Sequence, residues 1–117
     1  DVLKRQVQIA RAQLQPVRTQ IERRRAETGN FPASLLLFLP ADSALFHVEY
    51  MISGAHFRVK TQAPTIDIDG RTIGFDSATD RWWNRHNDLA SDLPDRRFEF
   101  REVCVHRDRL WTCKRDD

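Results

Sequence analysis

The chain has 117 residues, of which 40% are hydrophobic and 31% are charged. This length predicts a single domain over residues 1–117, and the composition excludes an intrinsically disordered chain. Lys and Arg number 19 and Asp and Glu 17, a net charge of +2 that is too small to indicate nucleic acid as the partner. No run of about 18 apolar residues occurs, so we expect no membrane span within this sequence, nor is there a secretory signal pattern.

Residues 1–28 show the clearest periodicity. Apolar side chains recur at intervals of four and three, which is the spacing of one face of an α-helix. They are Leu3, Val7, Ala10, Leu14, Val17 and Ile21. The predicted helix is about 40 Å long, and Pro16 should kink it or start a new segment because proline removes a backbone hydrogen bond. We expect its N-terminal half to project beyond the globular part and to contact a partner.

A basic line runs beside this apolar stripe at intervals of seven residues. Its members are Lys4, Arg11, Arg18 and Arg25. Residues 1–28 hold seven basic and three acidic side chains, a net charge of +4, whereas residues 29–117 have a net charge of −2. In a coiled coil such a line flanks the apolar seam. Three interpretations stay open: a solvated flank, salt bridges to neighbouring subunits, or a nucleic-acid surface.

The predicted helix ends in a turn. Gly29 suits the left-handed position after the last helical residue, and Pro32 prevents the helix from continuing. Residues 29–43 then form a connecting turn and a short apolar segment. We expect Phe31 and the leucines that follow to pin the helix end to a sheet.

Residues 44–117 have the alternation and turn signals of β-structure. The turn Ser53-Gly54 predicts a hairpin with Glu49 opposite Arg58 and Tyr50 opposite Phe57, or, after a shift, Glu49 opposite Lys60. A second hairpin is expected around Asp69-Gly70, with Ile66 facing Ile73. Residues 76–95 are polar and rich in turn formers. One helix followed by strands is an α+β pattern, here a long helix packed on an antiparallel sheet of about four to six strands.

The two cysteines lie in the last predicted hairpin, whose turn is Asp108-Arg109. With a two-residue turn there, Cys104 faces Cys113 at a non-hydrogen-bonded pair, where the close Cα spacing suits a disulfide. A disulfide implies an oxidising compartment, whereas two unrelated thiols would fit a cytosolic protein. Two cysteines without a matched histidine pair do not supply the ligands of a zinc site.

The sequence contains no catalytic template. The four histidines share no metal-ligand spacing, and neither a Gly-rich phosphate loop nor a nucleophile motif occurs, so we predict a protein that is not an enzyme and has no cofactor. The aspartates of the polar loop either offer oxygen donors for a calcium ion or serve as turn formers. They are Asp76, Asp80, Asp88 and Asp92, with Asp67 and Asp69 before them. Trp82 and Trp83 form an exposed contact or two structural anchors.

The segment from Ile21 to Pro40 resembles type IV pilins and type II secretion pseudopilins. A long N-terminal helix with Pro16 partway along it, the turn Gly29-Asn30-Phe31-Pro32, a Ser-Leu segment and a C-terminal disulfide hairpin carry this resemblance. The resemblance implies a helix packed across an antiparallel sheet and a structural subunit of a filament. It also implies that the chain is the soluble part of a longer protein, from which the peptidase site and an apolar helix of about twenty residues have been removed.

The resemblance leaves the filament system open. It implies a pilin or minor pilin of a type IV pilus-like filament, anchored in the inner membrane with a periplasmic domain and then part of a surface filament of a Gram-negative bacterium. Its partners would be other subunits and the inner-membrane assembly machinery, through the apolar stripe and basic line. Alternatives are a minor pseudopilin of a type II secretion system, a DNA-binding competence pilin, and a free periplasmic binding module.

Overall fold

The computed structural model describes residues 2–41, 45, 47–62, 72–85 and 99–115, without the side chains of residues 2–4, 6–7, 72 and 83–85. Within these ranges the chain forms one long helix followed by strands, the predicted α+β order. The helix α1 spans Val2–Thr28 and the short 3₁₀ helix η1 spans Leu36–Phe38. The strands are β1 (His47–Ser53), β2 (His56–Gln62), β3 (Thr72–Asp76), β4 (Arg81–Arg85), β5 (Phe100–Arg107) and β6 (Leu110–Arg115).

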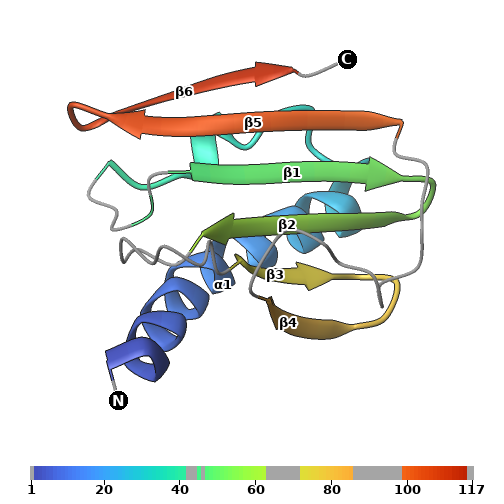
Figure 1. Cartoon of the computed structure of the whole chain (residues 1–117). Coiled ribbons are helices and arrows are strands. Elements are labelled where there is room, and N and C mark those ends of the chain that lie inside the picture. Colours follow the sequence, from blue (N-terminus) through green and yellow to red (C-terminus); the bar gives the residue numbers. More distant parts are fainter. Residues whose placement is uncertain (1, 42–44, 46, 63–71, 86–98, 116–117) are drawn as a thin grey trace.

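The six described strands form one antiparallel sheet in the order β4-β3-β2-β1-β5-β6 (Figure 1). The first four strands follow one another across the sheet, and β5 then pairs with the free side of β1. The last hairpin is therefore added at the opposite edge from β4. Figure 1 shows the N-terminus of α1 and strand β6 at opposite ends of the molecule.

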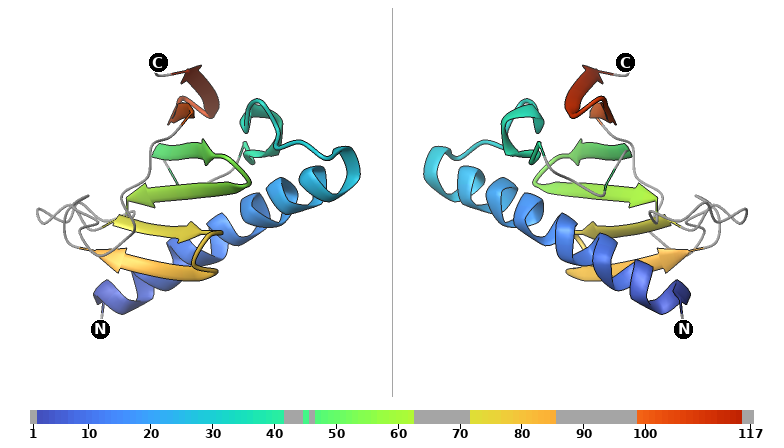
Figure 2. Two further views of the ribbon diagram at one scale, coloured as in Figure 1. Left: turned by 90° about the vertical axis from the view of Figure 1, so that its right-hand side faces the viewer. Right: turned by 90° about the vertical axis from the view of Figure 1, so that its left-hand side faces the viewer.

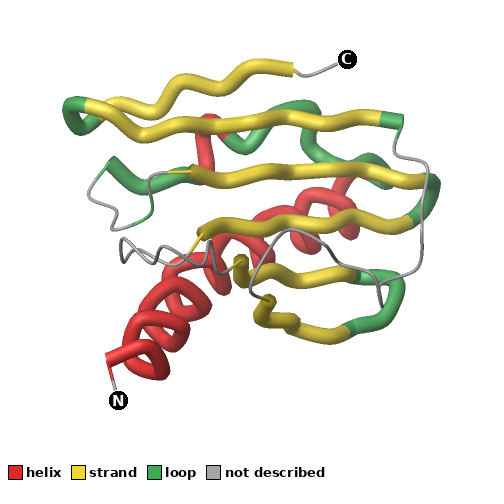
Figure 3. Tube along the Cα trace, in the orientation of Figure 1, coloured by secondary structure: helices red, strands yellow, loops and turns green. Residues whose placement is uncertain are grey.

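Helix α1 crosses one face of the sheet, where it contacts β2 and β3. Figure 2 shows that the segment leading to η1 returns on the same side of the sheet as the C-terminal part of α1. The helix runs as one uninterrupted element (Figure 3), so Pro16 does not start a new segment, and the proline lies on the exposed side. The predicted helix is thus confirmed.

The sheet has two chemically different faces because successive side chains along a strand point in opposite directions. The helix face is apolar, and its buried members include Val48, Tyr50, Phe57, Val59, Ile73 and Phe75. They form one core with the buried residues of α1 and of the segment that follows it. The outer face carries charged side chains, among them Glu49, Arg58 and Lys60.

The first hairpin adopts the shifted register. Ser53 pairs with His56, Tyr50 with Val59 and Glu49 with Lys60, so the predicted pairs of Tyr50 with Phe57 and of Glu49 with Arg58 are wrong. The turn residues are Gly54-Ala55, and Gly54 has a φ of 59°. Glycine at the first central position, with a positive φ there alone, is the signature of a type II′ turn, which matches the twist of the strands.

Two predictions for the middle of the chain also need correction. Arg81–Arg85 form strand β4, so residues 76–95 are not turns alone. Ile73 pairs with Thr61 on one side and Asn84 on the other, which leaves no place for the predicted partner Ile66. The turn predicted at Asp69-Gly70 lies outside the described residues.

Candidate functional site: an assembly surface

The apolar stripe of α1 lies inside the subunit. Ala10, Leu14, Val17 and Ile21 are wholly buried in the core beneath the sheet. Burial of the side chains of Leu14, Val17 and Ile21 contributes about 1.5–3 kcal/mol each. The interpretation of these four residues as a filament interface is therefore wrong, since they are not accessible to another subunit. The side chains of Leu3 and Val7 lie outside the description, so their predicted role is untested.

The described arginines of the basic line contact aromatic rings of their own subunit. The guanidinium of Arg18 lies 3.7 Å from the ring centre of Phe75 and forms ion pairs with Glu22 at 2.8 Å and Asp80 at 3.6 Å. That of Arg11 lies 5.1 Å from the ring centre of Trp82. Cations over aromatic faces contribute about 0.5–1 kcal/mol each when partly exposed. The described part of the line thus covers the aromatic border of the core, which none of the three earlier interpretations included.

Arg25 continues this pattern at the end of the helix. Its guanidinium lies 4.6 Å from the ring centre of Phe31, and Arg24 on the neighbouring flank lies 5.7 Å from that of Phe38. The side chain of Lys4 lies outside the description.

The face of α1 that points away from the sheet is accessible over its whole described length. Gln8, Ala12, Gln15, Pro16 and Thr19 are exposed, and Ile9 beside them is 40% exposed. Small and uncharged side chains on a helix let another helix approach closely. From Gln8 onward, this exposed surface rather than the buried part of the apolar stripe is accessible to a neighbouring molecule.

The predicted turn after the helix is confirmed. Gly29 has a φ of 79° and donates a hydrogen bond to the carbonyl of Arg25 at 2.9 Å. Phe31 packs edge-on against Phe57 with ring centres 5.6 Å apart. The carbonyl of Pro32 accepts a hydrogen bond from the hydroxyl of Tyr50 at 2.8 Å. The turn motif therefore fixes the helix end to strands β1 and β2.

Two buried polar groups complete this attachment, and sequence reasoning missed both. The carboxylate of Glu102 accepts a hydrogen bond from the backbone N–H of Leu35 at 2.9 Å. Burial, together with the negative charge of Glu102, raises the pKa of Tyr50 well above its usual value. The hydroxyl of Tyr50 thus stays protonated and keeps donating to Pro32. No local signal predicts these contacts, which span 18 and 67 positions of the sequence.

The C-terminal hairpin matches its prediction pair for pair. Arg107 faces Leu110 across the turn, and Cys104 faces Cys113. The two cysteines form a disulfide with their Cα atoms 4.0 Å apart. Asp108 and Arg109 have φ angles of 53° and 66°, as a type I′ hairpin turn requires.

The disulfide hairpin is also tied to the segment after α1. The indole N–H of Trp111 donates to the carbonyl of Pro40 at 2.8 Å, and the ring of His106 stacks on Trp111 with centres 4.8 Å apart. Cys104 is wholly buried against the core. The hairpin therefore forms a braced edge of the sheet.

The predicted calcium loop is only partly described. The carboxylate of Asp76 is buried, accepts from Arg58 at 2.8 Å and from the backbone N–H of Ala78 at 2.9 Å. Asp80 pairs with Arg18. Asp76 thus stabilises the β3–β4 turn, and Asp80 contacts the helix. Asp67, Asp69, Asp88 and Asp92 lie outside the described residues.

The three described histidines lie in different parts of the sheet. His47 lies 3.9 Å from Glu49 at the start of β1, His56 follows the first turn, and His106 stacks on Trp111. His86 lies outside the described residues. Glu102, Cys104 and Cys113 bring ligand-type atoms within 4.8 Å of one another, but the sulfur atoms are joined in the disulfide and are not thiolate ligands.

The structure shows the surroundings of Trp82 but not those of the Trp83 side chain. Trp82 is half-buried, with its ring centre 5.5 Å from that of Phe75 and Arg11 above it. It is a structural anchor and not the exposed contact that we considered. The side chain of Trp83 lies outside the description, so its role as an exposed contact is untested.

Comparison with protein-family models, with curated proteins and with solved structures finds no match. Among the described residues, no helix is long and apolar enough to cross a membrane.

Proposed function

We propose that the chain is the globular domain of a structural subunit in a type IV pilus-like filament. The observation that carries this proposal is the combination of one long helix lying across an antiparallel sheet, a Gly29-to-Pro32 turn fixed to that sheet, and a disulfide hairpin at the far edge. The helix buries one side in its own subunit and leaves the other accessible, which suits packing of helices between subunits.

The exposed helix surface supports an assembly role more directly than the apolar stripe does. Ala12, Pro16 and Thr19 are small or compact and exposed, so a neighbouring helix can come close without displacing long side chains. The basic residues at positions 11, 18 and 25 contact aromatic rings of their own subunit. This arrangement favours a filament subunit over a DNA-binding competence pilin.

The first test is the sequence that precedes Asp1 in the intact gene product. We expect a short basic leader ending in glycine, followed by about twenty apolar residues that contain one glutamate, the length of a membrane span. An ordinary cleavable signal peptide would overturn the filament proposal and favour a free periplasmic binding module. A minor pseudopilin would share the leader, and the genes alongside would distinguish the two systems.

The second test is assembly of the full-length protein in its host. Ala12→Glu places a charge on the exposed helix surface, and Ala33→Glu makes the same change at an exposed position after the helix. We expect Ala12→Glu to reduce incorporation into sheared filaments at least tenfold and Ala33→Glu to leave it unchanged. Equal incorporation of both variants would contradict assembly through this surface.

A competence pilin makes a different prediction. Phosphate binding depends steeply on salt, so measurable DNA binding at roughly 50 mM salt that disappears as salt rises would favour it. We expect no such binding by the folded domain.

A further inference from the structure

Strand β6 ends the sheet and leaves one edge open. It is the last strand in the sheet order, and no described segment pairs with its outer side. Cys104 and Cys113 have their Cα atoms 4.0 Å apart, as expected for a non-hydrogen-bonded pair. The backbone N–H and C=O groups of Cys113, and of Trp111 two residues earlier, therefore point away from β5. Such an edge is a template for another extended chain.

Two contacts within the domain fix the position of β6. The disulfide joins β6 to β5, and the hydrogen bond from Trp111 to Pro40 joins it to the segment after α1. Ordering a flexible strand costs free energy that would be subtracted from binding. Because β6 is already braced, little of that cost remains.

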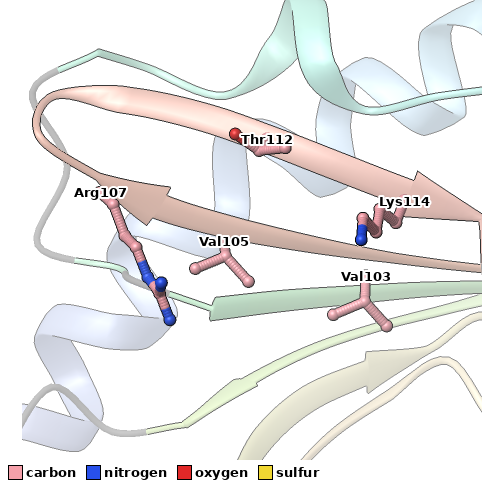
Figure 4. A pocket seen from close by; sticks show the side chains of 5 residues that line it. All are labelled: Val103, Val105, Arg107, Thr112 and Lys114. Carbon is pink, nitrogen blue, oxygen red and sulfur yellow. The ribbon is translucent and has the colours of Figure 1, made fainter.

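A hollow lies beside the open edge, on the outer face of the same hairpin. It has a volume of about 360 Å³ and is lined by Val103, Val105, Arg107, Thr112 and Lys114 (Figure 4). The two valines are half-buried, and the other three side chains are exposed. Figure 4 shows Arg107 at one end, Val103 and Lys114 side by side at the other, and Val105 between them. The hollow thus offers an apolar floor between two cations.

Two cationic side chains line this hollow. Among the described residues, neither the guanidinium of Arg107 nor the ammonium of Lys114 has an ion pair, a hydrogen bond or a ring contact. Leu110, which precedes the hollow on the same face of β6, is 71% exposed. An apolar surface with unpaired cations at its ends fits a partner that carries apolar and acidic groups together.

We propose that β6 binds an extended segment of another protein as a seventh, antiparallel strand. The backbone of that segment pairs with Trp111 and Cys113, and alternate side chains lie over the outer face. Its apolar side chains lie beside Leu110 and Thr112 on the outer face of β6, and its carboxylates pair with Lys114 and with the long side chain of Arg107. This inference does not depend on the proposed function, because the edge and the hollow belong to the folded domain itself.

The chemistry of the edge favours a peptide over other anionic partners. A strand edge presents donors and acceptors in alternation, and another extended backbone satisfies both kinds. Lipid head groups and nucleic-acid phosphates offer acceptors but no matching row of donors. A second copy of β6 brings its own Lys114 and Arg115, so like charges oppose pairing between two copies.

The experiment uses a capped peptide, acetyl-Val-Thr-Glu-Thr-Val-Thr-Glu-amide, and the oxidised domain. In the proposed pairing the Thr side chains lie on the helix face, so the Thr nitrogens are the ones that donate to β6. We expect saturable binding, with amide NMR shifts centred on Trp111 and Cys113. Methylating the Thr nitrogens should abolish binding, whereas methylating the Val and Glu nitrogens should preserve it.

Charge reversals test the side-chain part of the proposal. Arg107→Glu and Lys114→Glu should each weaken binding by about threefold to tenfold, the range expected when an exposed ion pair becomes a repulsion. Arg81→Glu makes the same change on exposed β4 at the other edge of the sheet, and should leave binding unchanged.

Four outcomes would overturn the proposal. The first is that the peptide shows no saturable binding, and the second is that the two methylated peptides bind equally well. The third is that the domain dimerises through β6 at the concentrations used. The fourth is capture of the domain by phosphatidylglycerol vesicles or single-stranded DNA when the peptide does not bind.

Discussion

The two faces of the sheet are built on different physical principles although they share the same strands. The helix face is sealed by apolar packing: the wholly buried side chains of α1 meet those of β2 and β3, and Arg11 and Arg18 cover the aromatic border. The outer face is organised by charge. Arg58 and Asp76 form a buried ion pair at 2.8 Å, and Glu49 lies within 3.3 Å of Lys60 and 3.1 Å of Arg101.

The difference shows how each face responds to change. Apolar burial is non-directional and scales with area, so removing atoms from the helix face costs stability in proportion to their number. A buried ion pair depends on both partners, because each charge alone is strongly destabilised away from water. The helix face should therefore respond to volume and the outer face to charge balance.

The largest effect is expected from breaking the buried pair on the outer face. Asp76→Ala removes the carboxylate that pairs with the buried Arg58 at 2.8 Å, and removing one partner of a buried ion pair typically costs about 3–5 kcal/mol. Replacing both partners, Arg58→Met with Asp76→Leu, should cost much less than the single change. Urea denaturation of the three proteins measures this, and a double variant as unstable as Asp76→Ala would show that volume, not charge balance, governs this face.

The helix face should show a smaller and graded loss. Leu14→Ala removes a wholly buried side chain and should lower the free energy of unfolding by about 3 kcal/mol, within the range for such cavities. Ile9 is 40% exposed on the same helix, so Ile9→Ala should cost below about 1 kcal/mol. Similar losses at both positions in urea denaturation would contradict the assignment of the buried stripe.

The comparison of the two faces also explains which features the sequence could predict. The helix, its glycine turn and the last hairpin depend on neighbours within about one turn or one hairpin, and all three were predicted correctly. Cys104 and Cys113 are nine positions apart, close enough for the turn residues to set their register. The first hairpin is confirmed, but its register stayed open between two alternatives because Gly54 can occupy either central position of a two-residue turn.

Contacts between distant segments could not be predicted in the same way. The partners Tyr50 and Pro32 are 18 positions apart, and Leu35 and Glu102 are 67 apart. Periodicity identified the apolar stripe and the basic line but not what would cover them. Only the three-dimensional arrangement reveals that the subunit buries the stripe from Ala10 to Ile21 and that Arg11 and Arg18 contact its own aromatic rings, so the candidate surface lies on the opposite side of α1.

The disulfide extends the comparison to the edge of the sheet formed by β5 and β6. Replacing Cys104 and Cys113 by Ala removes a cross-link over a short loop, which should cost about 2–3 kcal/mol. The loss should be concentrated in β6, since the link lies between the last two strands. Hydrogen exchange checks this: amides of β6 should exchange faster while those of β2 change by no more than the loss of global stability. A uniform change across the sheet would indicate that the hairpin does not open separately.

The smallest effect concerns a polar group within the apolar face. Tyr50→Phe removes the hydroxyl that donates to Pro32, and should cost about 1 kcal/mol at pH 7, the usual net worth of a hydrogen bond. Burial, with the charge of Glu102, raises the pKa of Tyr50 in the folded state, so the unfolded chain loses this proton first as the pH rises above about 10.

The pH dependence of the free energy of unfolding distinguishes the effect of the Tyr50 hydroxyl from the effect of ring packing. Above about pH 10 the unfolded state binds fewer protons than the folded state at this position, so the wild type loses stability with rising pH. Tyr50→Phe lacks that group, and its free energy of unfolding should fall less steeply between pH 9 and pH 11, as measured by urea denaturation at each pH. Parallel slopes for the two proteins would mean that the Tyr50 hydroxyl ionises as readily in the folded chain as in the unfolded one. Water would then reach the Tyr50 hydroxyl on the helix face. The helix face would therefore differ less from the charged outer face than the buried hydrogen bond of Tyr50 implies.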